Sequence, residues 1–177
     1  MVAPMNTYQR IALATVAIAV AAAILYPLLS PSGNAHERIP VRLGTPAAGR
    51  LLKSDAEWKA VLSPEAYRIT RERGTEPPFS AAGHNSKADG EYHCVCCQQP
   101  LFDSSAKFDS GTGWPSFFQP LNENAISLFG ENSRFDNRTE VVCSRCDAHL
   151  GHVFTDGPRP TGQRYCMNMG AMIFAPR

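Results

Sequence analysis

The six cysteines of this chain are the residues best suited to chemistry, and five of them gather in two short motifs. Cys94 and Cys97 form one Cys-x-x-Cys pair, and Cys143 and Cys146 form a second. Tetrahedral zinc prefers soft thiolate ligands, and a two-residue gap inside a tight turn lets both sulfurs of a pair face one ion. The pairs therefore predict one structural four-cysteine zinc site per chain, with no position left for water or substrate.

Two other readings of these cysteines remain open at this stage. The pairs could form disulfides or a redox couple, particularly in an exported domain. A redox pair normally opens a helix after a strand, whereas strand and turn signals surround both motifs here, which favours zinc. Cys96 is surplus to the four ligands, and could be a small apolar residue, a reserve ligand or a thiol partner.

The sixth cysteine, Cys166, stands alone in "RYCMN". Side chains alternate between faces in an extended segment, so Arg164, Cys166 and Asn168 are expected to share one face. A guanidinium beside a thiol favours the thiolate, which makes Cys166 a candidate nucleophile. A buried, inert cysteine is the alternative.

Two histidines and a carboxylate precede Cys166 in "HLGHVFTDGP". His149 and His152 could supply a proton donor and an orienting partner, and Asp156 could hold an imidazole in position. A second metal site built on the histidines lacks an obvious third ligand. In the glycine-rich "FDSGTGWPSF", Trp114 could form one wall of an apolar pocket, although a tryptophan is more often part of the core.

Local signals indicate which elements must position these residues. A capping box that begins at Ser54 and a Ser63-Pro64 helix start predict two short helices at about 55–62 and 64–72. Downstream, Gly, Pro and Asn separate short segments of β character, namely "EYHCV", "KFDS", "TEVVC", "HLGHVF" and "RYCMNMGAMIF". We therefore predict a mainly β, antiparallel domain with short helices at its N-terminal edge.

The N-terminal region contains a long apolar segment at residues 11–29, interrupted only by Thr15. A helix of this length can span a bilayer core, which predicts a transmembrane anchor after a flank at 1–10. The Pro- and Gly-containing residues 30–50 are predicted to be a flexible linker, and the folded domain is expected at 51–177. The membrane would then be a partner through this anchor, with the catalytic domain exported, on the periplasmic side in a bacterium. A cleaved signal peptide giving a secreted form is the main alternative, and a buried core helix is a weaker one.

The charge is nearly balanced, with 17 Lys+Arg against 16 Asp+Glu and a formal net charge of +1. No basic run with interleaved aromatic residues occurs in the sequence. The electrostatic signature of a nucleic-acid-binding protein is therefore missing, and nucleic acid is excluded as an expected partner.

Taken together, the two Cys-x-x-Cys pairs, "KFDSGTGWPSF", "HLGHVFTDGP" and "RYCMN" resemble the methionine-R-sulfoxide reductases of the B type. The resemblance covers about 54–174. It implies two antiparallel β-sheets with short N-terminal helices and a structural zinc. It also implies an oxidoreductase that repairs the R epimer of methionine sulfoxide in oxidised proteins under oxidative stress, with thioredoxin or another dithiol as reductant.

The resemblance implies a catalytic role for four residues of this sequence. Cys166 matches the nucleophile that attacks the sulfoxide sulfur and becomes a sulfenic acid. His149, His152 and Asn168 match residues that bind and polarise the sulfoxide oxygen, mostly through water.

Three further residues match the substrate-binding surroundings of the family. Trp114 matches the residue whose ring receives the substrate methyl group, and Asp156 and Arg164 match the surrounding charged network. Many family members carry a resolving cysteine where this chain has Thr112, so a dithiol would have to act directly on the sulfenic acid, or Cys96 would have to substitute.

Two functions outside this family are the alternatives. A non-catalytic zinc module would explain four cysteines but not Cys166, the two histidines or Trp114. A thiol-disulfide oxidoreductase would use one Cys-x-x-Cys pair and would not hold zinc there.

Overall fold

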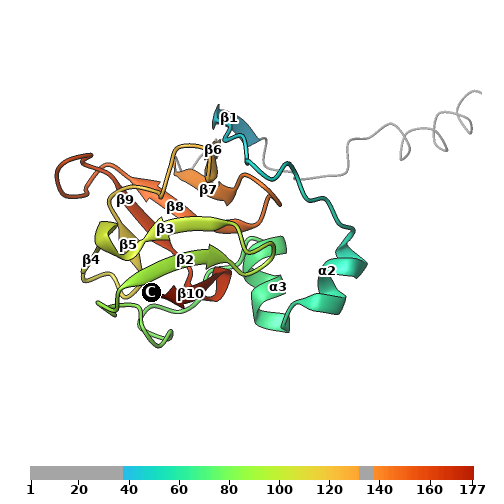
Figure 1. Cartoon of the computed structure of the whole chain (residues 1–177), viewed down its shortest axis with the longest axis horizontal. Helices are drawn as coiled ribbons and strands as arrows, with labels where there is room; N and C mark the ends of the chain where they lie inside the picture. Colours follow the sequence, from blue (N-terminus) through green and yellow to red (C-terminus); the bar gives the residue numbers. More distant parts are fainter. Residues whose placement is uncertain (1–37, 132–137) are drawn as a thin grey trace, which may run out of the picture. The chain divides into compact units, whose positions relative to one another are not determined.

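Antiparallel strands in two sheets, with two short helices, make up the part of the chain that the computed structural model describes, residues 38–131 and 138–177 (Figure 1). The mainly β fold class with two antiparallel sheets and short N-terminal helices, predicted from the sequence, is confirmed.

The two helices begin at the predicted residues. Helix α2 (Asp55–Val61) has Ser54 as its N-cap, and the capping box with Glu57 is complete in both directions. Helix α3 (Pro64–Arg71) has Ser63 as its N-cap, and its side chain accepts a backbone N–H of the first turn. Because capping groups satisfy N–H donors that have no partner inside the helix, these local signals fix where both helices start.

The larger sheet has seven strands in the order β1-β6-β7-β8-β9-β5-β4, and all neighbours are antiparallel. The strands are β1 (Arg38–Arg42), β4 (Lys107–Phe108), β5 (Ser116–Phe117), β6 (Ile126–Glu131), β7 (Thr139–Cys143), β8 (His149–Phe154) and β9 (Arg164–Met167). Strands β8 and β9 lie side by side within this sheet (Figure 1). The histidine segment and the Cys166 segment are therefore direct neighbours.

The smaller sheet has the order β10-β2-β3. Its strands are β2 (Gly90–Cys94), β3 (Pro100–Asp103) and β10 (Met172–Pro176), and the 3-10 turn η1 (Ser104–Ala106) follows β3. The first Cys-x-x-Cys pair begins at the last residue of β2 and continues into the turn before β3, and the second begins at the last residue of β7 and continues into the turn before β8 of the larger sheet. A metal held by both pairs would therefore link the two sheets.

Aromatic side chains fill the space between the sheets. Phe102 of β3 stacks on Phe117 of β5, with ring centroids 4.5 Å apart, and Tyr92 of β2 meets Phe117 edge-on at 5.0 Å. Tyr165 of β9 packs against Phe102 at 5.9 Å. Such pairs contribute about 0.5–1.5 kcal/mol each beyond the burial of their area. They hold β9, which carries Cys166, against the smaller sheet.

The segment "RYCMNMGAMIF" does not continue as the single β segment that the sequence indicated. Strand β9 ends, the 3-10 turn η2 (Met169–Ala171) follows, and β10 then joins the other sheet. The reason is a buried carboxylate: the N–H groups of Met169 and Gly170 donate to Glu76 at 2.7 and 2.9 Å instead of to a strand. Strands β1, β3, β5 and β6 also went unpredicted, and β1 lies inside the range 30–50 expected to be a linker.

The membrane anchor predicted at residues 11–29 is corrected. Within 38–131 and 138–177, no helix is long and apolar enough to cross a membrane. The two α-helices there have 7 and 8 residues, against the ~20 needed for a bilayer core. The segment 11–29 itself lies outside the described residues. The transmembrane assignment, the membrane as a partner and the membrane-anchored, exported location are therefore withdrawn.

Candidate active site and metal centre

The first Cys-x-x-Cys turn is closed by two backbone hydrogen bonds. The N–H of Gln98 donates to the carbonyl of Cys94 at 2.8 Å, and the N–H of Cys94 donates to the carbonyl of Gln99 at 2.9 Å. Gln98 has a φ of 61°, in the left-handed region. The turn therefore reverses the chain directly after Cys97 and leaves both thiols on its inner side.

The second turn repeats this geometry. The N–H of Asp147 donates to the carbonyl of Cys143 at 2.9 Å, and the N–H of Cys143 donates to the carbonyl of Ala148, also at 2.9 Å. Asp147 has a φ of 62°. Two distant stretches of sequence thus build the same thiol-presenting turn.

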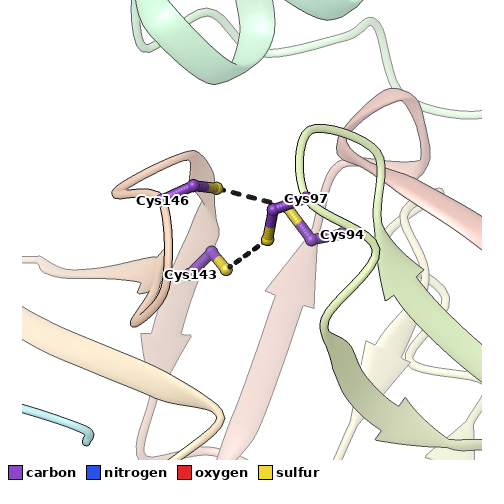
Figure 2. A group of neighbouring side chains, drawn as sticks. All are labelled: Cys94, Cys97, Cys143 and Cys146. Carbon is purple, nitrogen blue, oxygen red and sulfur yellow. Dashed lines mark hydrogen bonds between the residues drawn. The ribbon is translucent and has the colours of Figure 1, made fainter. Parts of the chain in front are cut away.

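The four thiols of these turns face one another (Figure 2). All four sulfurs lie within 4.8 Å of one another, with 3.7 Å between Cys94 and Cys146 and 3.5 Å between Cys97 and Cys143. Four sulfurs at about 2.3 Å from one ion would lie roughly 3.8 Å apart, so the cluster fits a tetrahedral metal. Disulfides would need about 2.05 Å between sulfurs, and all four cysteines are free thiols. The cysteines are positioned to hold a metal ion, as the sequence predicted.

The crowding of these thiols is itself an argument for a cation. The hydrogen bond with Cys143, followed by those with the other sulfurs and by burial, raises the pKa of the Cys94 thiol well above its usual value. Thiolates crowded into a buried space repel one another, and a coordinated divalent ion removes this penalty.

Cys166 lies on β9 between two strands of the larger sheet. Its backbone is in register with His152 of β8 on one side and with Ser116 of β5 on the other. Side chains directly opposite on antiparallel strands share one face, with Cβ atoms about 4.5–5.5 Å apart. Within β9, Arg164 and Cys166 are partly exposed while the residues between and after them are buried, as the alternation predicted.

A cavity of about 100 Å³ opens beside Cys166. It is lined by Thr75, Trp114, Arg138, Gly151, His152, Phe154, Cys166, Met167 and Asn168. Four of the residues singled out in the sequence therefore meet at one hollow: Cys166, His152, Asn168 and Trp114. His149, Arg164 and Asp156 are not among its lining residues in the described part of the chain.

A β-bulge brings the two histidines together. The register of β8 against β7 shifts between His149 and Gly151, so Leu150 is an extra residue in the strand. As a result the rings of His149 and His152 lie with their centroids 5.3 Å apart. Gly151 allows β8 to approach β9 closely, because a Cβ there would be 2.2 Å from the carbonyl oxygen of Cys166.

His149 is buried and paired with a buried carboxylate. Its Nδ1 lies 2.8 Å from Glu140 Oε1, and the two side chains are 2% and 1% exposed. Arg38 and Arg73 also contact the Glu140 carboxylate, at 3.0 and 2.5 Å. Burial opposes ionisation of Glu140, but the hydrogen bond with His149 and the charges around it prevail and lower its pKa.

The ionised Glu140 fixes how His149 is oriented. The carboxylate accepts the Nδ1 proton, which leaves Nε2 as the other functional atom of the ring. Within the described residues, this Nε2 is buried and has no hydrogen-bond partner. Glu140 was not identified from the sequence, because its pairing with a residue nine positions away depends on the β7-β8 register.

Glu76 is a second residue that the sequence did not reveal, and it holds two of the cavity residues. Its N–H donates to Asn168 Oδ1 at 3.0 Å, and its carbonyl accepts the indole N–H of Trp114 at 3.0 Å. The buried carboxylate, in a residue only 3% exposed, binds the two N–H groups that follow Asn168. The side chain of Asn168 also donates to the carbonyl of Leu150 at 3.1 Å.

Arg164 and Asp156 form a charged pair next to the cavity. Two nitrogens of Arg164 donate to the two carboxylate oxygens of Asp156, both at 2.8 Å. This pairing raises the pKa of Arg164 and lowers that of Asp156, and Cys166 contributes to the shift at Arg164 after Asp156 and burial. The guanidinium also lies 4.3 Å from the ring centre of Phe154, which lines the cavity.

Three hydroxyl groups form a hydrogen-bonded series that begins next to the sulfur of Cys166. Its Sγ lies 3.8 Å from Thr112 Oγ1, which is 2.8 Å from Ser110 Oγ, and Ser110 Oγ is 2.7 Å from Ser116 Oγ. A hydroxyl can donate or accept, so the Thr112 hydroxyl can donate a hydrogen bond to a thiolate or accept one from a thiol.

Cys96 lies on the first metal-site turn. Its Sγ donates to Thr70 Oγ1 of α3 at 3.4 Å. In the described part of the chain it is not among the residues that line the cavity.

Comparisons with known proteins agree on one family. A profile described as "SelR domain" matches residues 62–176. The "Peptide methionine sulfoxide reductase MsrB" of Pseudomonas fluorescens is 54% identical over 128 residues, which cover 72% of this chain and 98% of that protein. The protein of the same name from Thiobacillus denitrificans is 55% identical over 125 residues, 71% of this chain and 95% of that protein. The "Peptide methionine sulfoxide reductase B1, chloroplastic" of Arabidopsis thaliana is 58% identical over 119 residues, 67% of this chain and 59% of that protein.

Proposed function

We propose that this chain, which belongs to the SelR-domain family of peptide methionine sulfoxide reductases, reduces the R epimer of methionine sulfoxide in oxidised proteins. The observation that carries this proposal is the cavity of about 100 Å³, where a thiol, an imidazole, a carboxamide and an indole meet. We assign residues 51–177 to the reductase domain, with β1 adding an edge strand from the preceding linker range.

Cys166 is the nucleophile of the proposed reaction. Its thiolate attacks the sulfoxide sulfur, and the charged Arg164 lies on the same partly exposed face of β9 as Cys166. The hydroxyl of Thr112 can donate to the same sulfur. Both features support a role in attack rather than in packing.

His152 is the proton donor, and the ring of His149 packs beside it. A sulfoxide oxygen leaves readily only once it is protonated, and a histidine titrates in the range that this task requires. His152 lines the cavity on the strand beside Cys166, and His149 is held against it by Glu140. Asn168 can direct its remaining amide hydrogen at the sulfoxide oxygen, because Nδ2 has two hydrogens and one is bound to Leu150.

Trp114 receives the methyl group of the substrate. Positive charge builds on the sulfoxide sulfur as its oxygen is protonated, and the face of an indole stabilises such a group. The hydrogen bond to Glu76 holds the indole in one orientation. With the methyl group on the indole and the oxygen at His152, only one epimer presents its sulfur to Cys166.

The sulfoxide oxygen is transferred from the substrate to the sulfur of Cys166. The sulfur–oxygen bond of the sulfoxide breaks, methionine leaves, and Cys166 carries a sulfenic acid; the substrate sulfur gains two electrons and the Cys166 sulfur loses two. A dithiol such as thioredoxin then supplies two electrons, becomes a disulfide and releases water. Thr112 stands 3.8 Å from Cys166 and offers no thiol, so the dithiol acts on the sulfenic acid directly.

The four-cysteine site would hold zinc in this proposal. Cys94, Cys97, Cys143 and Cys146 supply four soft ligands at distances that suit its tetrahedral geometry. When bound, zinc would brace the two sheets and take no part in the chemistry, since all four positions are filled by protein.

The test is an assay of the purified chain on separated R and S epimers of methionine sulfoxide, with dithiothreitol as reductant. We expect turnover of the R epimer alone, and none with Cys166→Ser. Equal turnover of both epimers, or an active Cys166→Ser variant, would remove the proposal in this form.

A further inference from the structure

Phe79 is a large apolar side chain displayed at the surface near the cavity. It is 64% exposed, and its backbone has a φ of 62°. A positive φ is uncommon for residues other than glycine and is most unfavourable for bulky ones. Such a conformation persists only where the surrounding structure enforces it, and it clusters at functional sites.

Contacts with Gly113, the residue before Trp114, enforce this conformation. The N–H of Phe79 donates to the carbonyl of Gly113 at 2.8 Å. A Cβ at Gly113 would lie 2.8 Å from Cδ2 of the Phe79 ring, so the ring rests directly on this glycine. The next residue is Trp114, whose indole is bound to Glu76, three residues before Phe79. The segments 76–79 and 113–114 therefore run side by side at the edge of the cavity.

The size of the cavity leaves most of a protein substrate outside it. An apolar cavity of about 150 Å³ holds one benzene molecule, so a space of about 100 Å³ takes only the tip of an oxidised methionine side chain. The substrate backbone and the neighbouring side chains must then lie on the surface around the opening. On the side of Trp114, that surface carries the exposed ring of Phe79.

We infer that Phe79 is a docking residue for the substrate polypeptide and contacts an apolar side chain next to the oxidised methionine. The inference rests on the proposed function and deepens it, because it names the kind of peptide that this site prefers. A fixed aromatic ring serves this purpose well, since little conformational freedom is lost when a peptide covers it.

The test compares three substrates with dithiothreitol as reductant. They are acetyl-methionine-R-sulfoxide, a tripeptide with leucine on both sides of the methionine-R-sulfoxide, and the same tripeptide with serine in place of leucine. The full chain is assayed beside Phe79→Asn, because asparagine tolerates a positive φ while it removes the ring. Phe79→Tyr retains the ring, and Leu52→Asn is the matched control at a position that is 75% exposed.

The expected result is a loss confined to the leucine peptide. Phe79→Asn should lower kcat/KM about tenfold on that peptide, mainly through KM, as expected for an apolar contact of about one side chain. Its kcat/KM on acetyl-methionine-R-sulfoxide should stay within about twofold of the unsubstituted chain. Phe79→Tyr and Leu52→Asn should leave the preference for the leucine peptide intact.

Other results would overturn the inference. Equal losses on all three substrates would mean that the ring only supports Trp114, and no loss on any would mean that it contacts nothing. A loss seen only when thioredoxin replaces dithiothreitol would assign the ring to the reductant. If the unsubstituted chain fails on acetyl-methionine-R-sulfoxide, the proposed function fails first, and the docking inference falls with it.

Discussion

Replacing Glu76 by alanine tests whether one buried carboxylate supports the cavity. The substitution removes the acceptors of the Met169 and Gly170 N–H groups at the start of η2. It also frees the backbone of residue 76, which binds Trp114 and Asn168. We expect both a loss of stability and a loss of activity.

The size of the stability loss follows from these two hydrogen bonds. A hydrogen bond to a charged group contributes about 1.5–3 kcal/mol, and a buried donor left without a partner adds to the cost. Glu76→Ala should therefore lower the free energy of unfolding by about 3–5 kcal/mol, a large fraction of the ~5–15 kcal/mol typical of a domain. Glu76→Gln keeps one acceptor oxygen and should lose about half as much.

The assay combines urea unfolding with kinetics on acetyl-methionine-R-sulfoxide. At a temperature where the variant remains folded, kcat/KM should fall at least tenfold, because the indole and the carboxamide lose their fixed positions. Glu57→Gln is the control: Glu57 belongs to the exposed capping box of α2, and its loss should cost far less stability and no activity. An alanine variant that loses less than about 1 kcal/mol, or a glutamine variant that loses as much as alanine, would refute this reasoning.

Four other substitutions test separate parts of the structure. Glu140→Gln should lower the free energy of unfolding by about 3 kcal/mol at pH 7, measured by urea unfolding. Because its pKa is lowered on folding, the stability that Glu140 provides is present above its unfolded pKa of about 4.3 and is lost as pH falls through the lower folded pKa, and the variant should lack that acid-induced loss. Thr112→Cys should form a disulfide with Cys166 after one turnover without reductant, seen as two thiols lost on titration, whereas an introduced thiol that stays free would place the two side chains too far apart. Cys143→Ser, or a strong chelator, should remove about one zinc per chain and lower the melting temperature, while two oxidisable pairs without metal would support a redox role. Gly151→Ala should abolish activity or folding, because its Cβ would meet the carbonyl oxygen of Cys166, and normal activity would contradict the close approach of β8 and β9.

The features that were predicted correctly from the sequence depend on short-range chemistry. Ser54 and Ser63 cap their helices through groups only three residues away, so the starts of α2 and α3 could be read directly. The two Cys-x-x-Cys turns are equally local, and their shared metal preference indicated that they meet. Family resemblance, rather than periodicity, singled out Cys166, His152, Asn168 and Trp114 together, and these four side chains line one cavity.

The features that went unpredicted depend on register and on contacts between distant segments. Glu140 reaches His149 through the pairing of two strands, and the bulge at Leu150 that aligns the histidines leaves no clear mark in the sequence. Glu76 binds residues more than ninety positions away. The apolar segment 11–29 lies outside the described residues, and its composition predicts only that a helix there would be long enough to span a bilayer core.

The edge of the larger sheet was missed for a related reason. Strand β1 contains Pro40 within a Pro- and Gly-rich region, a composition typical of a linker. Proline is tolerated in an edge strand, and β1 lies at the edge of the sheet, paired with β6 alone.

The most direct measurement of the central claim is the fate of the substrate oxygen in a single turnover. The full chain would be mixed with an equal amount of methionine-R-sulfoxide, without reductant and with a reagent that traps sulfenic acids, and then analysed by peptide mass spectrometry. We predict one trapped group on Cys166 for each methionine formed. Methionine formed without a trapped group on Cys166, or with the group on Cys96 instead, would contradict the account.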